Sequence, residues 1–307
     1  MGKKGKRLQL LNSCVKQIES LSWKTLDGEQ VQIKDIFICP LCLDVIYLSR
    51  LKEEELNHVI SLEDVPPKSI GGKPILVTCK KCNNKCGHDI DVYLRNELIY
   101  REDIKSTKGR NAKISFDGIE VNSTFSINDD NSLLFSMTRA NDPKKIKQIS
   151  ENMRNSGKSW TMNAQITLSD VKRNSTAADV ALLKSAYLLA FKKLGYAYIF
   201  NSRLSVVREQ IDNPKESILS NYIVGDERYI KDYIKDGVYR AYFNDMEILM
   251  VVFSLQLDNS EIKLRKAIAL PPVNLETDIY EALSKSKEFS ISIIEEIPDN
   301  EKHSILP

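Results

Sequence analysis

The chain has 307 residues, 42% of them hydrophobic and 28% charged, and a formal net charge of +2. These values are ordinary for a soluble globular protein, and the near-neutral balance gives no global argument for nucleic-acid binding. No apolar run reaches the roughly 20 residues that a membrane-spanning helix needs. The basic start, Met1 to Arg7, is not followed by the apolar core and cleavage site of a signal peptide. We therefore expect no membrane partner and a cytoplasmic location.

The first half of the chain predicts a helix, a cysteine-rich module and a small sheet. Residues 8–21 place apolar side chains at helical spacings of three and four. The cysteine-rich module runs from Ile36 to about Tyr100. A β-meander is expected after it, with turns at Asp117-Gly118 and at residues 128–131. Its three predicted strands are 113–116, 120–127 and 132–138.

The second half begins with a polar, basic segment at residues 142–159. A helix is predicted over 177–194, with Thr176 as its N-cap and Gly195 as its end. Because this helix is apolar around most of its circumference, we expect it in the core of the second half. Three further strands are predicted, and a frayed end is expected from Glu295. The strands are 239–243, 247–256 and 262–270, the last stopped by Pro271-Pro272.

Four of the six cysteines form two C-x-x-C knuckles separated by 36 residues: Cys39 with Cys42, and Cys79 with Cys82. Each knuckle turn can bring two sulfurs to one ion, so two knuckles predict a closed tetrahedral zinc site with a structural role. Cys14 and Cys86 are left over. Cys86 is an alternative ligand because it follows Cys82 by four residues.

Between the knuckles, Glu63 and Asp64 precede a Pro- and Gly-rich loop, and an apolar stretch leads from there to Cys79. This order predicts a strand carrying two carboxylates, a second strand paired with it, and a helix starting at the second knuckle. The carboxylates would then lie near the first turn of that helix. Carboxylate and amide oxygens are ligands suited to Mg²⁺.

The run over about residues 36–95 closely resembles the HNH endonuclease family, in the branch whose ββα-metal motif is braced by four cysteines. The resemblance rests on C-x-x-C, acidic-x-x-Pro-x-Ser-x-Gly-Gly and C-x-x-C-Asn-x-x-Lys. It implies that Glu63 and Asn83 hold a catalytic divalent ion such as Mg²⁺. The family's general base, a histidine, falls on Asp64 in this chain.

That departure leaves three ways to activate water. Asp64 could act as a base, although an ordinary aspartate is weaker than histidine at neutral pH. Asp64 could instead enlarge the cation site, with a metal-bound hydroxide as the nucleophile. A third option is His88 on the following helix, with its ring oriented by Asp91.

A local cationic surface is predicted beside this centre, because five lysines and no acid lie between Val65 and His88. Such a surface suits phosphate binding, and we expect nucleic acid, most of all double-stranded DNA, as the partner. The lysines are Lys68, Lys73, Lys80, Lys81 and Lys85.

Together these features predict an α+β protein with a zinc-stapled HNH-like ββα domain at residues 1–105 and a mixed α+β domain at 106–307. The second domain would recognise a target, form a homo-oligomer or bind a partner protein. The leading hypothesis is a metal-dependent endonuclease that hydrolyses phosphodiester bonds. A zinc-containing nucleic-acid-binding module with a degenerate catalytic centre is the alternative, and a protein-interaction scaffold is the third.

Overall fold

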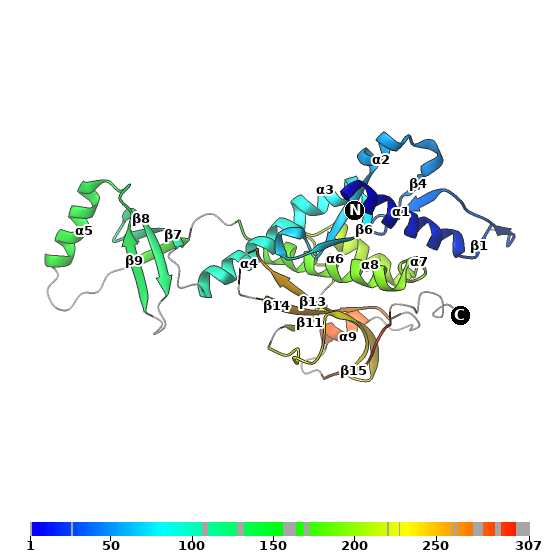
Figure 1. Ribbon diagram of the computed structural model, residues 1–307. Helices are drawn as coiled ribbons and strands as arrows, with labels where there is room; N and C mark the ends of the chain where they lie inside the picture. Colours follow the sequence, from blue (N-terminus) through cyan, green and yellow to red (C-terminus); the bar gives the residue numbers. More distant parts are fainter. Residues whose placement is uncertain are drawn as a thin grey trace. The chain divides into compact units, whose positions relative to one another are not determined.

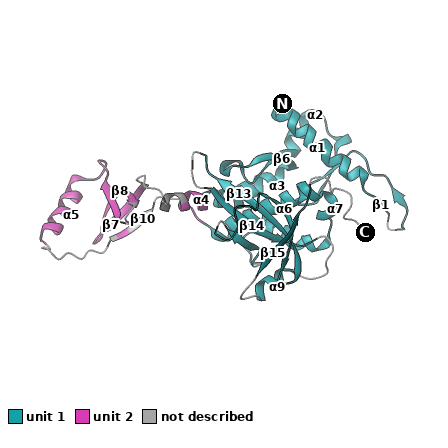
Figure 2. Cartoon of the chain, turned by 60° about the horizontal axis from the view of Figure 1, so that its bottom comes forward, with its two compact units in different colours: residues 1–95, 174–307 teal, residues 96–173 magenta. Residues whose placement is uncertain are grey.

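A computed structural model describes residues 2–25, 27–105, 110–127, 132–155, 164–168, 172–219, 221–226, 228–258, 260, 263–272, 279–285 and 290–298. The chain divides into two compact units, one made of residues 1–95 and 174–307 and the other of residues 96–173 (Figure 2). The division differs from the predicted boundary at residue 105, because the cysteine-rich module shares one unit with the C-terminal part of the chain. None of the described helices has the length and apolar character to cross a bilayer.

Unit 1 begins with helix α1 (Lys3–Ser20), which confirms the predicted amphipathic helix and extends it toward the N-terminus. Leu11, Cys14 and Ile18 are its buried residues. This helix contacts β3 (Ile36–Ile38) and β6 (Lys73–Cys79). The short elements around it are β1 (Trp23–Lys24), β2 (Gln30–Val31), β4 (Val45–Tyr47), η1 (Leu48–Arg50) and α2 (Glu53–Val59).

The predicted hairpin and helix are present between the two knuckles. Strand β5 (Ile60–Val65) pairs antiparallel with β6, and a short helical turn, η2 (Lys68–Ile70), lies in the connection. Helix α3 (Lys80–Cys86) starts directly after β6 and contacts both strands. A π-helical turn, η3 (Gly87–Asp91), joins it to α4 (Val92–Lys105). The arrangement is strand, strand and helix, as the residue pattern indicates.

The longest apolar helix, α6 (Ser175–Leu194), connects the two halves of unit 1. It contacts β5 and η3 as well as strands of the C-terminal sheet, and Figure 1 shows it between these elements. The predicted end at Gly195 is confirmed, with φ of 77° there. The predicted N-cap is wrong: the Asn174 side chain, not that of Thr176, accepts a hydrogen bond from the backbone N–H of Ala177. Helix α6 therefore packs against the N-terminal module as well as against the C-terminal sheet.

The C-terminal part of unit 1 is a five-stranded antiparallel sheet in the order β11-β14-β13-β12-β15. The three predicted strands are confirmed as β12, β13 and β14, while β11 and β15 were not predicted. Their bounds are β11 (Ile223–Asp226), β12 (Gly237–Phe243), β13 (Met246–Gln256), β14 (Lys263–Leu270) and β15 (Ile291–Glu296). The helices of this part are α7 (Tyr196–Ile199), η4 (Ser202–Leu204), α8 (Ser205–Asp212) and α9 (Ile279–Lys285).

Unit 2 contains the predicted β-meander, observed as β7 (Arg110–Phe116), β8 (Ile119–Ile127) and β9 (Leu133–Met137). The Asp117-Gly118 turn is confirmed, with positive φ at both residues. A fourth strand, β10 (Ala164–Leu168), pairs with β7, and the basic segment forms helix α5 (Pro143–Asn155). Ile149 of α5 joins the core that the sheet provides. The predicted turn at residues 128–131 lies outside the described residues.

The two ends of unit 2 are tied to each other. The Asn96 side-chain amide donates to the backbone carbonyl of Lys172 at 2.9 Å. Arg173 donates to the Glu97 carboxylate at 2.9 and 3.1 Å, and its guanidinium lies 3.6 Å from the centre of the Tyr100 ring. Because its entry and exit lie together, unit 2 is an insertion within unit 1.

We expect unit 1 to fold without this insertion. Replacing residues 101–170 with a short Gly/Ser linker should leave one cooperative thermal transition by circular dichroism, because insertions with close ends cost little loop entropy. Loss of cooperative unfolding in the shortened chain would contradict the division into two units.

Candidate metal centre

The first knuckle forms the turn between β3 and β4. The backbone N–H of Leu43 donates to the carbonyl of Cys39 at 2.8 Å, and that of Cys39 donates to the carbonyl of Asp44 at 3.0 Å. Leu43 has a positive φ of 59°. This tight turn brings the sulfurs of Cys39 and Cys42 close together.

The second knuckle lies where β6 ends and α3 begins. Cys79 is the N-cap of α3, and its sulfur accepts a hydrogen bond from the backbone N–H of Cys82 at 3.4 Å. The backbone N–H of Cys79 also donates to the sulfur of Cys39 at 3.3 Å. Such N–H donors stabilise thiolate sulfurs, which are the form that binds a metal.

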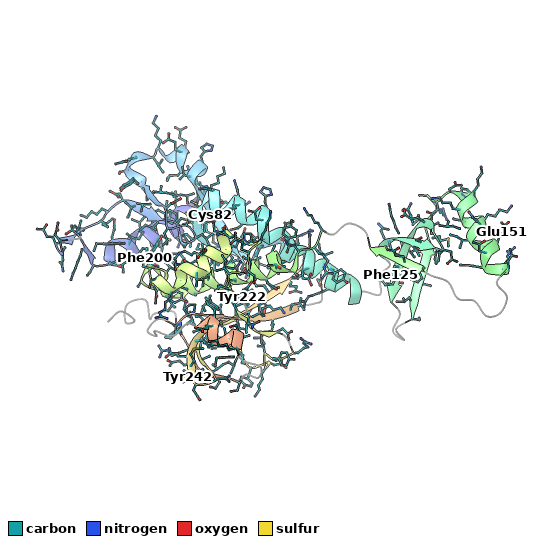
Figure 3. All side chains as sticks on the ribbon, turned by 180° about the vertical axis from the view of Figure 1, so that it is seen from behind. Cys82, Phe125, Glu151, Phe200, Tyr222 and Tyr242 are labelled. Carbon is teal, nitrogen blue, oxygen red and sulfur yellow. The ribbon has the colours of Figure 1, made fainter. Side chains whose placement is uncertain are left out.

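The four sulfurs lie within 4.8 Å of one another, so they can hold a metal ion such as zinc. The Cys42 and Cys79 sulfurs are 3.8 Å apart, which is about the separation of two sulfurs at the corners of a tetrahedral zinc site. Figure 3 marks Cys82 of this centre. The four predicted ligands are thus brought together.

The alternative ligand Cys86 is not part of the four-sulfur cluster. Its thiol is buried, and this burial raises its pKa to about 12. Cys14 is also buried, and burial raises the pKa of its thiol to about 11. Both cysteines are therefore neutral side chains of the core at physiological pH.

The predicted catalytic centre is occupied by an ion pair within the protein. Glu63 is only 3% exposed, and its Oε1 accepts a hydrogen bond from the Nζ of Lys184 at 2.9 Å. Its Oε2 accepts from the hydroxyl of Thr78 at 3.0 Å. Lys184 also donates to Oδ2 of Asp91 at 2.7 Å. A lysine ammonium therefore lies between Glu63, the predicted metal ligand, and Asp91, the residue expected to orient His88.

Burial and charge act in opposite directions on this cluster. Burial lowers the pKa of Lys184, but the nearby carboxylates of Glu63 and Asp91 outweigh it and raise the pKa above its ordinary value. Burial also raises the pKa of Asp91 to about 6, against the opposing effect of Lys184. Lys184 is thus a permanent cation, and Asp91 Oδ1 is buried with no hydrogen-bond partner among the described residues.

The other predicted metal ligand, Asn83, has a structural contact. Its side-chain amide donates to the hydroxyl of Ser61 at 3.0 Å and to the carbonyl of Leu62 at 2.8 Å. These bonds attach α3 to β5. As arranged, Glu63 does not fit a divalent ion, because the ammonium of Lys184 already provides its counter-charge.

The hydrogen bonds of Lys184 go to Glu63 and Asp91, and neither candidate base, Asp64 or His88, accepts one of them. Asp64 is half-buried, and burial, with Glu63 next to it, raises its pKa, while Lys68 opposes the shift. His88 is exposed on η3. The expected pairing of Asp91 with His88 is wrong, because Asp91 Oδ2 accepts its hydrogen bond from the ammonium of Lys184 instead.

The five predicted phosphate-binding lysines do not form one patch. Lys68 and Lys73 lie at the loop end of the hairpin, whereas Lys80 and Lys81 start α3 at the other end of β6. A seven-residue strand separates these ends by roughly 20 Å. Lys85 pairs with Asp212 of α8 at 2.5 Å.

Lys184 is not among the predicted site residues, although the sequence holds a signal for it. It is the one charged residue of a helical stretch, Val180 to Tyr187, in which Ser185 is the other polar aliphatic side chain. A buried lysine needs a carboxylate partner, and Glu63 and Asp91 of the cysteine-rich module provide two.

Comparisons with known protein families, with curated proteins and with solved structures find no match to this chain. The reading of the site therefore depends on its own residues.

We expect Cys79→Ser to lose the bound ion and the cooperative unfolding of unit 1, because metal binding in such knuckles stabilises the folded state directly. The measurement is metal content by mass spectrometry alongside thermal unfolding. Cys86→Ser is the matched control and should keep one ion per chain. Equal metal content in the two variants would rule out the four-sulfur centre.

Lys184→Met should destabilise the fold by about 3–5 kcal/mol at pH 7, because two buried carboxylates lose their counter-charge. Without the ammonium, the pKa of Asp91 rises further. An acid whose pKa is raised by folding stabilises the fold at low pH and loses that effect as pH rises through the folded-state pKa. The loss in free energy of unfolding of Lys184→Met relative to the wild type should therefore be smaller at pH 5 than at pH 7, as measured by urea unfolding.

The triple variant Glu63→Gln, Asp91→Asn, Lys184→Met removes all three charges and should recover much of the loss at pH 7. A deficit in Lys184→Met that is the same at pH 5 and pH 7 would contradict the buried ion pair.

Proposed function

We propose that this chain is a zinc-braced nucleic-acid-binding protein whose HNH-like module lacks a working catalytic centre. The observation that carries the proposal is the Lys184 ammonium between Glu63 and Asp91. It supplies internally the positive charge that a divalent ion would bring. The four cysteines would hold a structural zinc ion and fix the module on which the binding surface is built.

The residues at the positions that correspond to the HNH motif also support a module without a working catalytic centre. Asp64 replaces the family's histidine, and Glu63 has both oxygens engaged within the protein. Asn83 uses its amide to hold α3 against β5. Glu63 and Asn83 thus each make contacts that stabilise the module, and Asp64 lacks the imidazole that the family uses as its base.

Positive charge around the hairpin supports an anionic partner. Lys3 and Lys6 of α1 and Lys68 of η2 lie close enough to Asp64 to lower its pKa against the effect of burial. Lys3 and Lys68 are exposed. Clustered lysines of this kind bind phosphates and give an affinity that falls with salt.

Endonuclease activity stays a prediction, because it requires Lys184 to leave Glu63 before a divalent ion can bind there. A nuclease would need that rearrangement to occur with substrate bound. Plasmid nicking in the presence of Mg²⁺, Mn²⁺, Ni²⁺ or EDTA tests it directly.

We expect no metal-dependent nicking by the wild type, and salt-sensitive binding of plasmid DNA by electrophoretic shift. Asp64→Ala and His88→Ala, at side chains outside the buried ion pair, should leave binding and folding unchanged. Metal-dependent cleavage that either substitution abolishes would overturn the proposal in favour of the endonuclease.

A further inference from the structure

Two neighbouring hollows lie on unit 1 and share Val252 and Glu296 in their walls. The first, of about 890 Å³, lies between the β5–β6 hairpin, the C-terminal end of α6 and the C-terminal sheet. Four lysines from three separate elements line it. They are Lys73 of β6, Lys192 and Lys193 of α6, and Lys263 of β14.

Among the described residues that line the first hollow, the four lysines outnumber the acidic side chains, which are Asp236 and Glu296. Asp236 is engaged within the protein, since it accepts hydrogen bonds from the backbone N–H and hydroxyl of Ser254 at 3.0 and 2.9 Å. Arg265 lies 3.8 Å from the same carboxylate. Lysines that converge on a cleft from several elements suit an anionic ligand.

The second hollow, of about 990 Å³, is aromatic at its rim. The loop between β11 and β12 contains the tetrad Tyr-Ile-Lys-Asp twice, at residues 229–232 and 233–236. Tyr229 and Tyr233 are 73% and 75% exposed. Ile230 is buried and Ile234 half-buried, so each repeat anchors one isoleucine and presents one tyrosine.

The loop that presents the tyrosines is braced by hydrogen bonds. The guanidinium of Arg265 donates to the carbonyls of Lys231 and Ile234. The hydroxyl of Tyr239 donates to the carbonyl of Lys235 at 2.8 Å. Two large aromatic rings are therefore held toward solvent on fixed turns.

A cation lies beside each exposed ring. The Arg228 guanidinium is 5.3 Å from the centre of the Tyr229 ring, and the Lys231 ammonium is 5.7 Å from that of Tyr233. Isolated exposed aromatics are common on protein surfaces. Two at the same place in a repeated turn, each beside a cation and next to a lysine-lined cleft, form a pattern that binds unstacked bases.

We propose that the two hollows form one track for single-stranded nucleic acid, in which the lysines of the first bind phosphates and Tyr229 and Tyr233 stack on bases. The inference rests on the proposed function and specifies its ligand. A duplex keeps its bases stacked inside the helix, so it cannot offer their faces to the tyrosines. A protein partner would suit the tyrosines but has no need of the four lysines.

The test uses the full-length, metal-loaded chain and fluorescence anisotropy with labelled 20-nucleotide oligo(dT), oligo(U) and a duplex of equal length. The wild type should bind a single strand more tightly than the duplex. Tyr229→Ala and Tyr233→Ala should each weaken single-strand binding by about 5- to 150-fold. Tyr229→Phe and Tyr233→Phe should keep it, because phenylalanine retains the stacking face.

Tyr242→Ala is the matched control, since Tyr242 is 42% exposed on the same sheet but lines neither hollow (Figure 3). Lys73→Ala and Lys263→Ala should each reduce the slope of log affinity against log salt by about 0.7. Lys24→Ala, at an exposed lysine of β1, should leave the slope unchanged.

Wild-type affinity in both tyrosine-to-alanine variants, with unchanged unfolding temperatures, would overturn the track. Binding of duplex but not of single strands would also overturn it while leaving the proposed function intact. No binding of any nucleic acid would contradict both.

Discussion

The architecture of unit 1 depends on a single buried lysine. Lys184 lies in the centre of α6 with its side chain 1% exposed, and it needs carboxylates at both sides of its ammonium group. Glu63 comes from β5 and Asp91 from η3, so meeting this need fixes the hairpin and the following helix on α6. Two buried tyrosines complete the attachment: Tyr187 donates to the carbonyl of Pro40 at 2.6 Å, and Tyr196 to that of Ile38. The first knuckle is thereby held as well.

This constraint bears on what the acids of the cysteine-rich module can bind. Glu63 and Asp91 both lie in that module, yet the cation that they bind is Lys184, 121 positions further along the chain than Glu63. A buried acid needs a counter-charge but does not specify which one. A lysine on a packed helix meets the same electrostatic need as a metal ion, and it cannot activate water. Whether these acids can hold a metal ion therefore depends on Lys184, a residue outside the module, so the sequence of the module alone does not reveal it.

Local patterns predicted most of the regular elements, because periodicity and turn chemistry act over a few residues. The strands of both sheets that alternate strongly, the turn at Asp117-Gly118 and the end of α6 at Gly195 all follow from such signals. The weak edge strands β10, β11 and β15 did not, since pairing with a distant strand stabilises them. The four cysteines were found because their spacing is itself local. The Lys184 contacts were missed because they join three elements far apart in the sequence.

The π-helical turn η3 has a consequence for how this module can change. An α-helix that gains one residue in a single turn shifts the angular position of everything after it by about 100°. Here that extra residue lies between the second knuckle and Asp91. It sets the phase between the metal-binding end of the helix and the carboxylate that faces Lys184. A one-residue insertion or deletion at Gly87 would rotate Asp91 relative to the second knuckle, so the contact with Lys184 depends on the length of this stretch as well as on its residues.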